Sequence, residues 1–215
     1  GIELATRLGD ERLAVFLGSW RALIAADAGR LDEAVELAER WLQRAASLGL
    51  KSGHAEALRA RAYVAQRAGD HRAAIAFARE DDKVLDGTDE SVNPVWLSAV
   101  LCESLIAEGE LGEAERRNER TLEATREAGM THFEGLALRV RGRLHAARGD
   151  AAAARKELDA AAAILEGLGS RIELGRTLYR LVSPQASFNH RSIVVHGITP
   201  DDVVEQPRID SVADE

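Results

Sequence analysis

The stretch AARGDAAAARKEL, residues 146–158, decides the fold because a glycine-aspartate pair there separates two alanine-rich segments. Alanine is the strongest helix former, glycine adopts the left-handed conformation that ends many helices, and aspartate is a good N-cap. The stretch therefore predicts one helix that ends near Gly149 and another that begins after Asp150. Arg148-Gly149-Asp150 also spells a cell-adhesion signal, but its place in a repeat favours a structural role.

The same turn occurs four times at a spacing of forty residues. The copies read AGRLDEA (28–34), AGDHRAA (68–74), EGELGEA (108–114) and RGDAAAA (148–154). A second glycine series has the same period half a repeat out of phase, at Gly9, Gly49, Gly129 and Gly169, and is interrupted only at Asp89. Two turns in every forty residues predict units of two helices, each of about 15 to 17 residues. Asp70 and Asp150 are the predicted caps of second helices.

Apolar residues recur at helical spacing in the first helix of each unit and are predicted to face the core. They are Leu17, Trp20 and Ile24; Ala57, Ala60 and Val64; Leu97 and Val100; and Ala137, Val140 and Leu144. Small residues at two further positions would let paired helices approach closely: Ala22, Ala62, Cys102 and Gly142, then Ala34, Ala74, Ala114 and Ala154. We therefore expect Cys102 to be a small buried residue rather than a reactive thiol.

Composition narrows the classes of partner and compartment. The 215 residues carry a net charge of -8, which argues against direct binding to nucleic acid, since a phosphate-backbone binder needs a basic face. The single cysteine excludes an internal disulfide and fits a reducing cytoplasm, where we expect the protein to reside. No apolar run approaches the roughly 18 residues of a membrane span, and no leader precedes the first helix. We expect no membrane association.

Together these positions resemble the tetratricopeptide repeat, which has a small residue at its eighth position, Gly-Asp at the turn and Ala at its twentieth. The matches are Ala22, Ala62, Cys102 and Gly142; Gly29, Gly69, Gly109 and Gly149; and Ala34, Ala74, Ala114 and Ala154. The unit departs from the family in its forty-residue length and at the fourth position, usually a large aromatic, which holds Gly18, Leu58, Ser98 and Leu138. Longer units of this kind are similar to the helical arrays of bacterial LuxR-type activators and ATPase-linked cyclase regulators.

The resemblance implies an all-α fold, a right-handed superhelical solenoid of antiparallel helix pairs. Residues 1–182 would form this domain: a partial second helix (1–8), four units and a capping helix (170–182). Because the chain begins at Gly1 and its only methionine is Met130, we expect it to be cut from a longer protein. Stacked pairs of this kind present a concave face, the usual binding surface of solenoids.

Two segments depart from the repeat. After Ser183, alanine is rare and three of the four prolines occur. The same segment contains six acidic residues and only two arginines. This non-helical tail (183–215) is predicted to be a mobile acidic extension, with a segment that folds back on the array or the start of another domain as alternatives. In DDKVLDGTDESVNP (81–94) we expect a frayed helix end and a long loop, with Pro94 starting the next helix. A divalent-ion site made from these acids is the minor alternative.

No catalytic motif accompanies the repeat. Phosphate loops, dinucleotide fingerprints and the GxSxG elbow are missing, and HAE (54–56) and HFE (132–134) lack the PCxxC half of a zinc deaminase site. The six histidines are scattered singly, so neither a metal cluster nor a His-carboxylate base can be nominated. We therefore predict no enzyme, no metal and no cofactor.

The predicted binding residues come from the family's groove-facing positions. These fall on Arg59, Tyr63, Gln66, Glu103, Arg139 and Arg143, with Phe16 and Trp96 nearby. Arginines beside aromatics suit an acidic or extended peptide; alternatively they only keep a helical surface soluble. We predict a protein-protein interaction or scaffold module of a larger cytoplasmic bacterial regulator, whose partner is a protein or peptide segment, possibly another domain of the parent. The alternative is a small-molecule effector sensor; the oligomeric state is left open.

Overall fold

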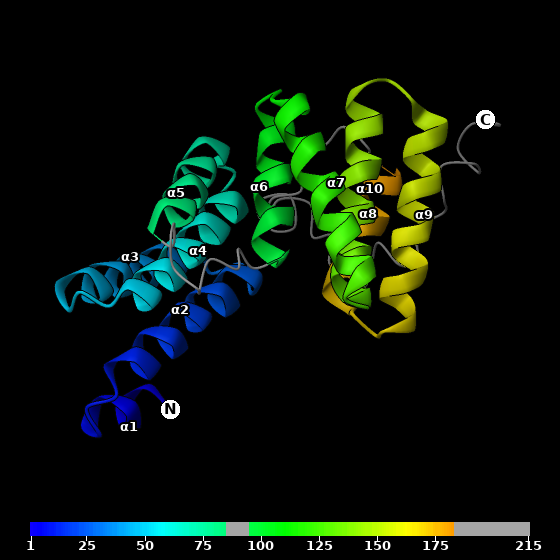
Figure 1. Ribbon diagram of the computed structural model, residues 1–215. Coiled ribbons are helices and arrows are strands. Elements are labelled where there is room, and N and C mark those ends of the chain that lie inside the picture. The colour runs from blue at the N-terminus through cyan, green and yellow to red at the C-terminus, as the bar shows by residue number, and fades with distance from the viewer. Residues whose placement is uncertain (85–94, 183–215) are drawn as a thin grey trace. The chain divides into compact units, whose positions relative to one another are not determined.

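The computed structural model describes residues 1–84 and 95–182, and each regular element within these ranges is an α-helix (Figure 1). The helices are α1 (Ile2–Arg7), α2 (Glu11–Asp27), α3 (Leu31–Ser47), α4 (Lys51–Ala68), α5 (His71–Val84), α6 (Val95–Ala107), α7 (Leu111–Glu127), α8 (Thr131–Ala147), α9 (Ala151–Gly167) and α10 (Arg171–Val182). The predicted all-α class is confirmed for these residues. The predictions for the loop at 85–94 and the tail at 183–215 lie outside the described residues.

The turns follow the glycine register. Every residue with positive φ in the described ranges is one of the eight predicted glycines: Gly9, Gly29, Gly49, Gly69, Gly109, Gly129, Gly149 and Gly169. At Gly149, φ is +81°, a value that a side chain makes costly, and its N–H donates to the carbonyl of Ala146 at 3.0 Å. The Asp150 carboxylate accepts from the N–H of Ala153 at 3.0 Å and so caps α9 as predicted.

The remaining member of the adhesion-like tripeptide also serves the fold. Arg148 donates from both terminal nitrogens to the carboxylate of Glu115 on α7, at 2.5 and 2.7 Å. Hydrogen bonds from Arg148 hold the pKa of Glu115 below its ordinary value. The three residues therefore end α8, tie α7 to α8 and start α9.

The helices pack in two compact units, Gly1–Ser104 and a second that begins at Leu105. In the first unit, α2 packs against α3 and α4, α3 against α4, α4 against α5, and the short α1 against α2. In the second unit, α8 packs against α7 and α9, and α9 against α10. Consecutive helices in the chain thus form neighbouring pairs, as a forty-residue helix-turn-helix repeat requires.

The small-residue positions are buried as predicted. Ala22, Ala62 and Cys102 have no exposed surface, and Gly142 is buried in the same register. A Cβ on Gly142 would lie 2.7 Å from Cγ of Leu158 and 3.1 Å from the carbonyl oxygen of Ala154, so the close approach of α8 and α9 requires glycine.

Gly18 explains one departure from the repeat family. A Cβ there would lie 2.0 Å from the indole ring of Trp41, which lies on α3. The space that a large aromatic on the first helix would occupy is therefore filled by an aromatic from the second helix. Bulk has moved across the helix pair, and the packing volume is retained.

The predicted core stripe is correct in three helices and wrong in α2. Ala57, Ala60 and Val64 of α4 are buried, as are Leu97 and Val100 of α6 and Ala137, Val140 and Leu144 of α8. In α2, however, Trp20 is 42% exposed, Ile24 is 62% exposed and Leu17 is only partly buried. The reason is positional: α4 has both α2 and α3 packed against it, whereas among the described residues only the short α1 packs on the corresponding side of α2.

The end of α5 is also not as predicted. The expected fraying at Asp81 and Asp82 does not occur, because α5 continues to Val84. Asp81 is only 1% exposed, and its Oδ2 accepts a hydrogen bond from Nε of Arg59 at 3.1 Å. A buried ion pair therefore replaces the apolar contact that other units make at this point.

Candidate interaction surface

The six predicted binding residues stand on the first helices of the units. Arg59, Tyr63 and Gln66 are on α4, Glu103 is on α6, and Arg139 and Arg143 are on α8. Their polar side chains are largely buried, since even the side chain of Arg59 is only 12% exposed. The contacts of these six residues within each compact unit show which helices they connect.

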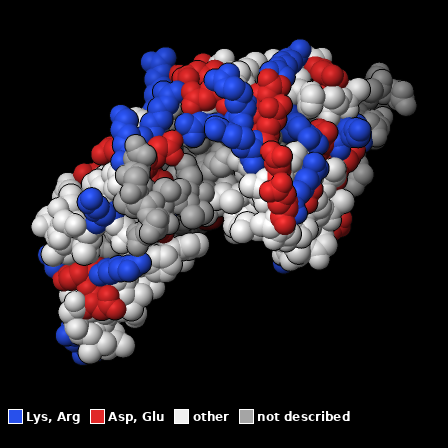
Figure 2. Space-filling model, viewed as in Figure 1, with Lys and Arg blue, Asp and Glu red and all other residues white. Residues whose placement is uncertain are grey.

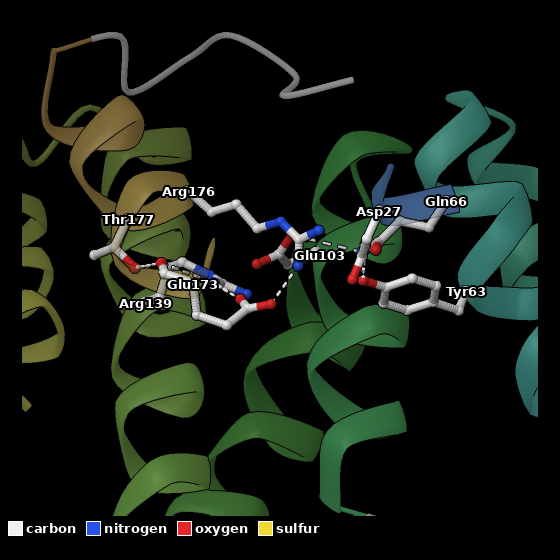
Figure 3. A network of polar contacts seen from close by, with 8 residues as sticks. All are labelled: Asp27, Tyr63, Gln66, Glu103, Arg139, Glu173, Arg176 and Thr177. Atoms are coloured by element: carbon white, nitrogen blue, oxygen red, sulfur yellow. Dashed lines mark hydrogen bonds and ion pairs between the residues drawn. The ribbon is translucent and has the colours of Figure 1, made fainter. Parts of the chain in front are cut away.

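Tyr63 joins three helices of the first unit (Figure 3). Its hydroxyl donates a short hydrogen bond to the Asp27 carboxylate at the end of α2. The edge of its ring packs against Trp96 of α6, with centroids 6.2 Å apart, and the Arg67 guanidinium lies 4.7 Å from its centroid. Such aromatic and cation–π contacts favour a fixed ring position.

Gln66 and Glu103 lie next to this tyrosine (Figure 3). The Gln66 amide donates to the backbone carbonyl of Val100 at 3.1 Å and to the Glu103 carboxylate at 3.5 Å. The structure thus brings Tyr63, Gln66 and Glu103 together, and all three are buried. Their hydrogen bonds connect α4 to α2 and α6.

Arg59 belongs to a separate buried charge cluster. Its guanidinium contacts Asp81 at 3.1 Å and Glu56 at 3.5 Å. Burial raises the pKa of Glu56 and of Asp81 above their ordinary values, while the positive charge of Arg59 opposes the rise. Carboxyl groups with raised pKa values at a partly open surface are a recognised property of functional sites and also of structural ion pairs.

Two aromatic side chains border this cluster. Trp20, like Arg59, acts against the rise in the pKa of Glu56, and the Phe16 ring lies 5.9 Å from the Trp20 ring. Phe16 is 45% exposed. We call Phe16, Trp20 and Trp96, which are exposed or partly exposed, the aromatic surface; all three lie in the first compact unit, as do Glu56, Arg59 and the buried Tyr63.

Sequence reasoning placed Phe16 and Trp96 near the site but missed Trp20, Glu56 and Asp81. Glu56, Arg59, Tyr63 and Gln66 are spaced three, four and three residues apart, so they share one face of α4. That spacing was the available signal for Glu56. Trp20 was assigned to the core because its helical register matches buried residues elsewhere.

In the second unit, Arg139 is held by α10 (Figure 3). Its guanidinium and that of Arg176 both contact the Glu173 carboxylate, and the Thr177 hydroxyl donates to the Glu173 carbonyl at 2.8 Å. Arg143 lies one turn further along α8 and is 7% exposed. Arg139 and Arg143 are thus brought together on α8, in a unit apart from the aromatic surface.

The charges visible on α7 alternate in sign. Figure 2 shows basic and acidic side chains interspersed in the region of this helix, whose charged residues are arginines and glutamates, among them Arg116, Glu119, Arg120 and Glu123. A mixed surface of this kind is typical of a solvated helix and differs from the basic stripe of a nucleic-acid binder.

Metal and membrane sites were sought in residues 1–84 and 95–182. No group of three or more His, Cys, Asp or Glu side chains in these residues could hold a metal ion, and none of the helices there has the length and apolarity to cross a membrane. No protein-family model matches this sequence, and no curated protein matches it at a significant level.

Proposed function

We propose that this chain is a protein-interaction module of a larger cytoplasmic bacterial signalling or transcriptional regulator. In this proposal its helix pairs stack as a right-handed superhelical solenoid, and the first helices carry the binding surface. The partner is a protein or peptide segment, which includes another domain of the parent polypeptide. The resemblance to tetratricopeptide repeats and the repeated helix pairs support the proposal.

The aromatic surface is the observation that carries the proposal. Trp, Tyr and Arg are the residue types that dominate binding energy in protein interfaces. Phe16 and Trp20 are both more than 40% exposed and contact each other, so they can bury further area against a partner without a rearrangement of the core.

The ion pairs of Arg59 bear on which kind of partner side chain contributes to binding. Arg59 already contacts two carboxylates, so its charge is largely matched within the unit. We therefore assign most of the affinity to apolar side chains of the partner that pack on Phe16 and Trp96. The polar cluster fixes the rings in position and orients the partner segment.

Calorimetry tests the proposal, with the full chain titrated by separately produced domains of the parent protein. We expect Phe16→Ala and Trp96→Ala each to weaken binding at least about tenfold, the effect of a moderate hot spot. Arg120→Ala, an exposed substitution on α7, is the control and should bind as the parent chain does.

Two results would count against this function. One is that no domain of the parent binds; the other is that binding is unchanged by both aromatic substitutions. A metabolite that raises the melting temperature of the chain while no protein partner binds would instead favour the effector-sensing alternative.

A further inference from the structure

One side of α2 is apolar and uncovered. Leu13, Leu17 and Ile24 are spaced four and seven residues apart, which places them on one side of the helix. Leu13 is 43% exposed and Ile24 is 62% exposed. We call these three residues the open face; Trp20, which belongs to the aromatic surface, stands in the same register between Leu17 and Ile24.

The same register is buried in the helices that follow. Ala57 and Val64 of α4 stand forty residues after Leu17 and Ile24 and have no exposed surface. Leu144 of α8, a further eighty residues on from Val64, is 3% exposed. Since Leu144 is as large as Ile24, the difference lies in what covers the position and not in side-chain size.

The packing of α4 shows what such a cover consists of. Ala57 lies in a cluster with Val15 of α2 and Ala45 of α3, so the register is closed by both helices of the preceding pair. Ala5 of α1 stands forty residues before Ala45 and is 2% exposed. The short α1 therefore supplies the second-helix half of the cover on α2, and the first-helix half has no counterpart in the described chain.

A depression lies where that counterpart would pack. It has a volume of about 390 Å³, opens to solvent, and is lined by Gly1, Ile2, Glu3, Leu17 and Arg21 from α1 and α2. Its lining includes the open-face residue Leu17 together with one acid and one base. Several side chains from an added helix could enter it.

We propose that the open face is the docking site for the first helix of a further pair of the same forty-residue kind, in which α1 is the end of the second helix. Its first helix would present small side chains to the open face. The buried side of α2, which receives α3 and α4, is largely of this kind: Ala14, Gly18, Ser19, Ala22, Ala25 and Ala26 lie there beside the larger Val15 and Leu23. A second copy of the chain fits less well, because α4 docks on α2 through unlike faces, whereas two open faces would meet as like surfaces.

An extended chain tests this inference. Residues 10–41 are placed before Ile2, so that the added helix continues into α1 in the forty-residue register. Ile24→Cys in a Cys102→Ala background reports on the open face, since Cys102 is buried and the added segment contains no cysteine. Glu123→Cys on α7, an exposed position, is the matched control.

We expect maleimide labelling at Ile24→Cys to be at least about tenfold slower in the extended chain than in residues 1–215, because labelling then requires local opening. Labelling at Glu123→Cys should be unchanged. Circular dichroism reports whether the added residues are helical, and sedimentation of residues 1–215 reports association.

Two results would overturn the inference. The first is an unchanged labelling rate at Ile24→Cys although the added residues are helical. The second is a dimer of residues 1–215 that protects Ile24→Cys and is dissociated by Leu17→Asp, since a second copy would then be the occupant. The inference rests on the proposed solenoid, but its readout does not involve Phe16 or Trp96, so it can fail while partner binding on the aromatic surface stands.

Discussion

The contact between Gly142 and Leu158 gives a quantitative test of how the helix pairs are packed. In a solvent-exposed helix, Gly→Ala stabilises by about 1 kcal/mol. At Gly142 the new Cβ would lie 2.7 Å from Cγ and 3.0 Å from Cδ2 of Leu158, a side chain that is 1% exposed. Overpacking of this kind costs about 1 to 3 kcal/mol, so we expect Gly142→Ala to be destabilising by about 1 kcal/mol after the helix gain is included.

Two further variants serve as comparisons for Gly142→Ala. Gly112→Ala on α7 has an arginine tip as its nearest contact, at 3.6 Å, so it should stabilise by roughly 0.5 kcal/mol. Leu158→Ala alone should cost about 2 to 5 kcal/mol through the cavity it leaves. Adding Gly142→Ala to Leu158→Ala should then be neutral or stabilising, with a coupling of about 1 to 2 kcal/mol between the two sites.

Urea unfolding followed by circular dichroism at 222 nm measures all four variants, compared at a constant slope of free energy against urea concentration. If Gly142→Ala stabilises as much as Gly112→Ala does, or if the cycle shows no coupling, the close approach of α8 and α9 does not limit the residue at this position.

Three further predictions concern the register, the caps and the buried charges. Leu144→Ala should cost about 2 to 5 kcal/mol in a urea titration, whereas Ile24→Ala, in the same register but exposed, should change stability by about 0.5 kcal/mol or less; equal costs would contradict the open face. Asp150→Ala should destabilise by about 1 kcal/mol and Asp150→Asn by much less, and equal losses would mean that the cap to α9 contributes little. Burial raises the pKa of Glu56 in the folded state above its value in the unfolded state. The charged carboxylate therefore destabilises the fold at a pH above the folded-state pKa, and this destabilisation is lost as the pH falls to the unfolded-state pKa, where the group is protonated in both states. Glu56→Gln should therefore raise the melting temperature at pH 7 and have progressively less effect toward pH 4.5; a constant difference would refute this linkage.

The sequence predicted features that depend on local chemistry. The left-handed turn at Gly149 and the cap at Asp150 follow from what these residue types do in any helical protein, so their spacing was sufficient to locate them. Burial is different, because it depends on a neighbour. Helical spacing correctly grouped Trp20 with Ile24, but periodicity identifies a face and cannot say whether another helix covers it.

A comparison between units, rather than along one helix, would have recovered part of the missing information. Leu158 faces Gly142, and the same register holds Ala38, Ala78 and Asn118 in the three earlier units. In the first two units, where this residue is Ala, the small-residue position holds Ala22 and Ala62; in the third unit, Asn118 goes with Cys102 and the volumes do not compensate. The compensation of volume between Leu158 and Gly142 is visible in the sequence once helix partners are known.

The buried arginines show why partner choice needs the structure. Arg59 and Arg139 are eighty residues apart and therefore occupy the same position of the repeat, yet their partners differ in kind. Arg59 pairs with Asp81 on the second helix of its own unit, whereas Arg139 pairs with Glu173 on the first helix of the next unit.

The second and fourth helix pairs of the repeat could therefore not be exchanged without a loss of stability. In the fourth unit the position of Asp81 is taken by Ala161, a core residue, so an arginine placed there must find its acid on α10. Removing Asp81 or Glu173 would take a carboxylate partner from a buried arginine, which costs on the order of several kcal/mol, whereas an apolar stripe would tolerate the exchange. The two ion pairs therefore tie equivalent arginines to different helices, α5 for Arg59 and α10 for Arg139.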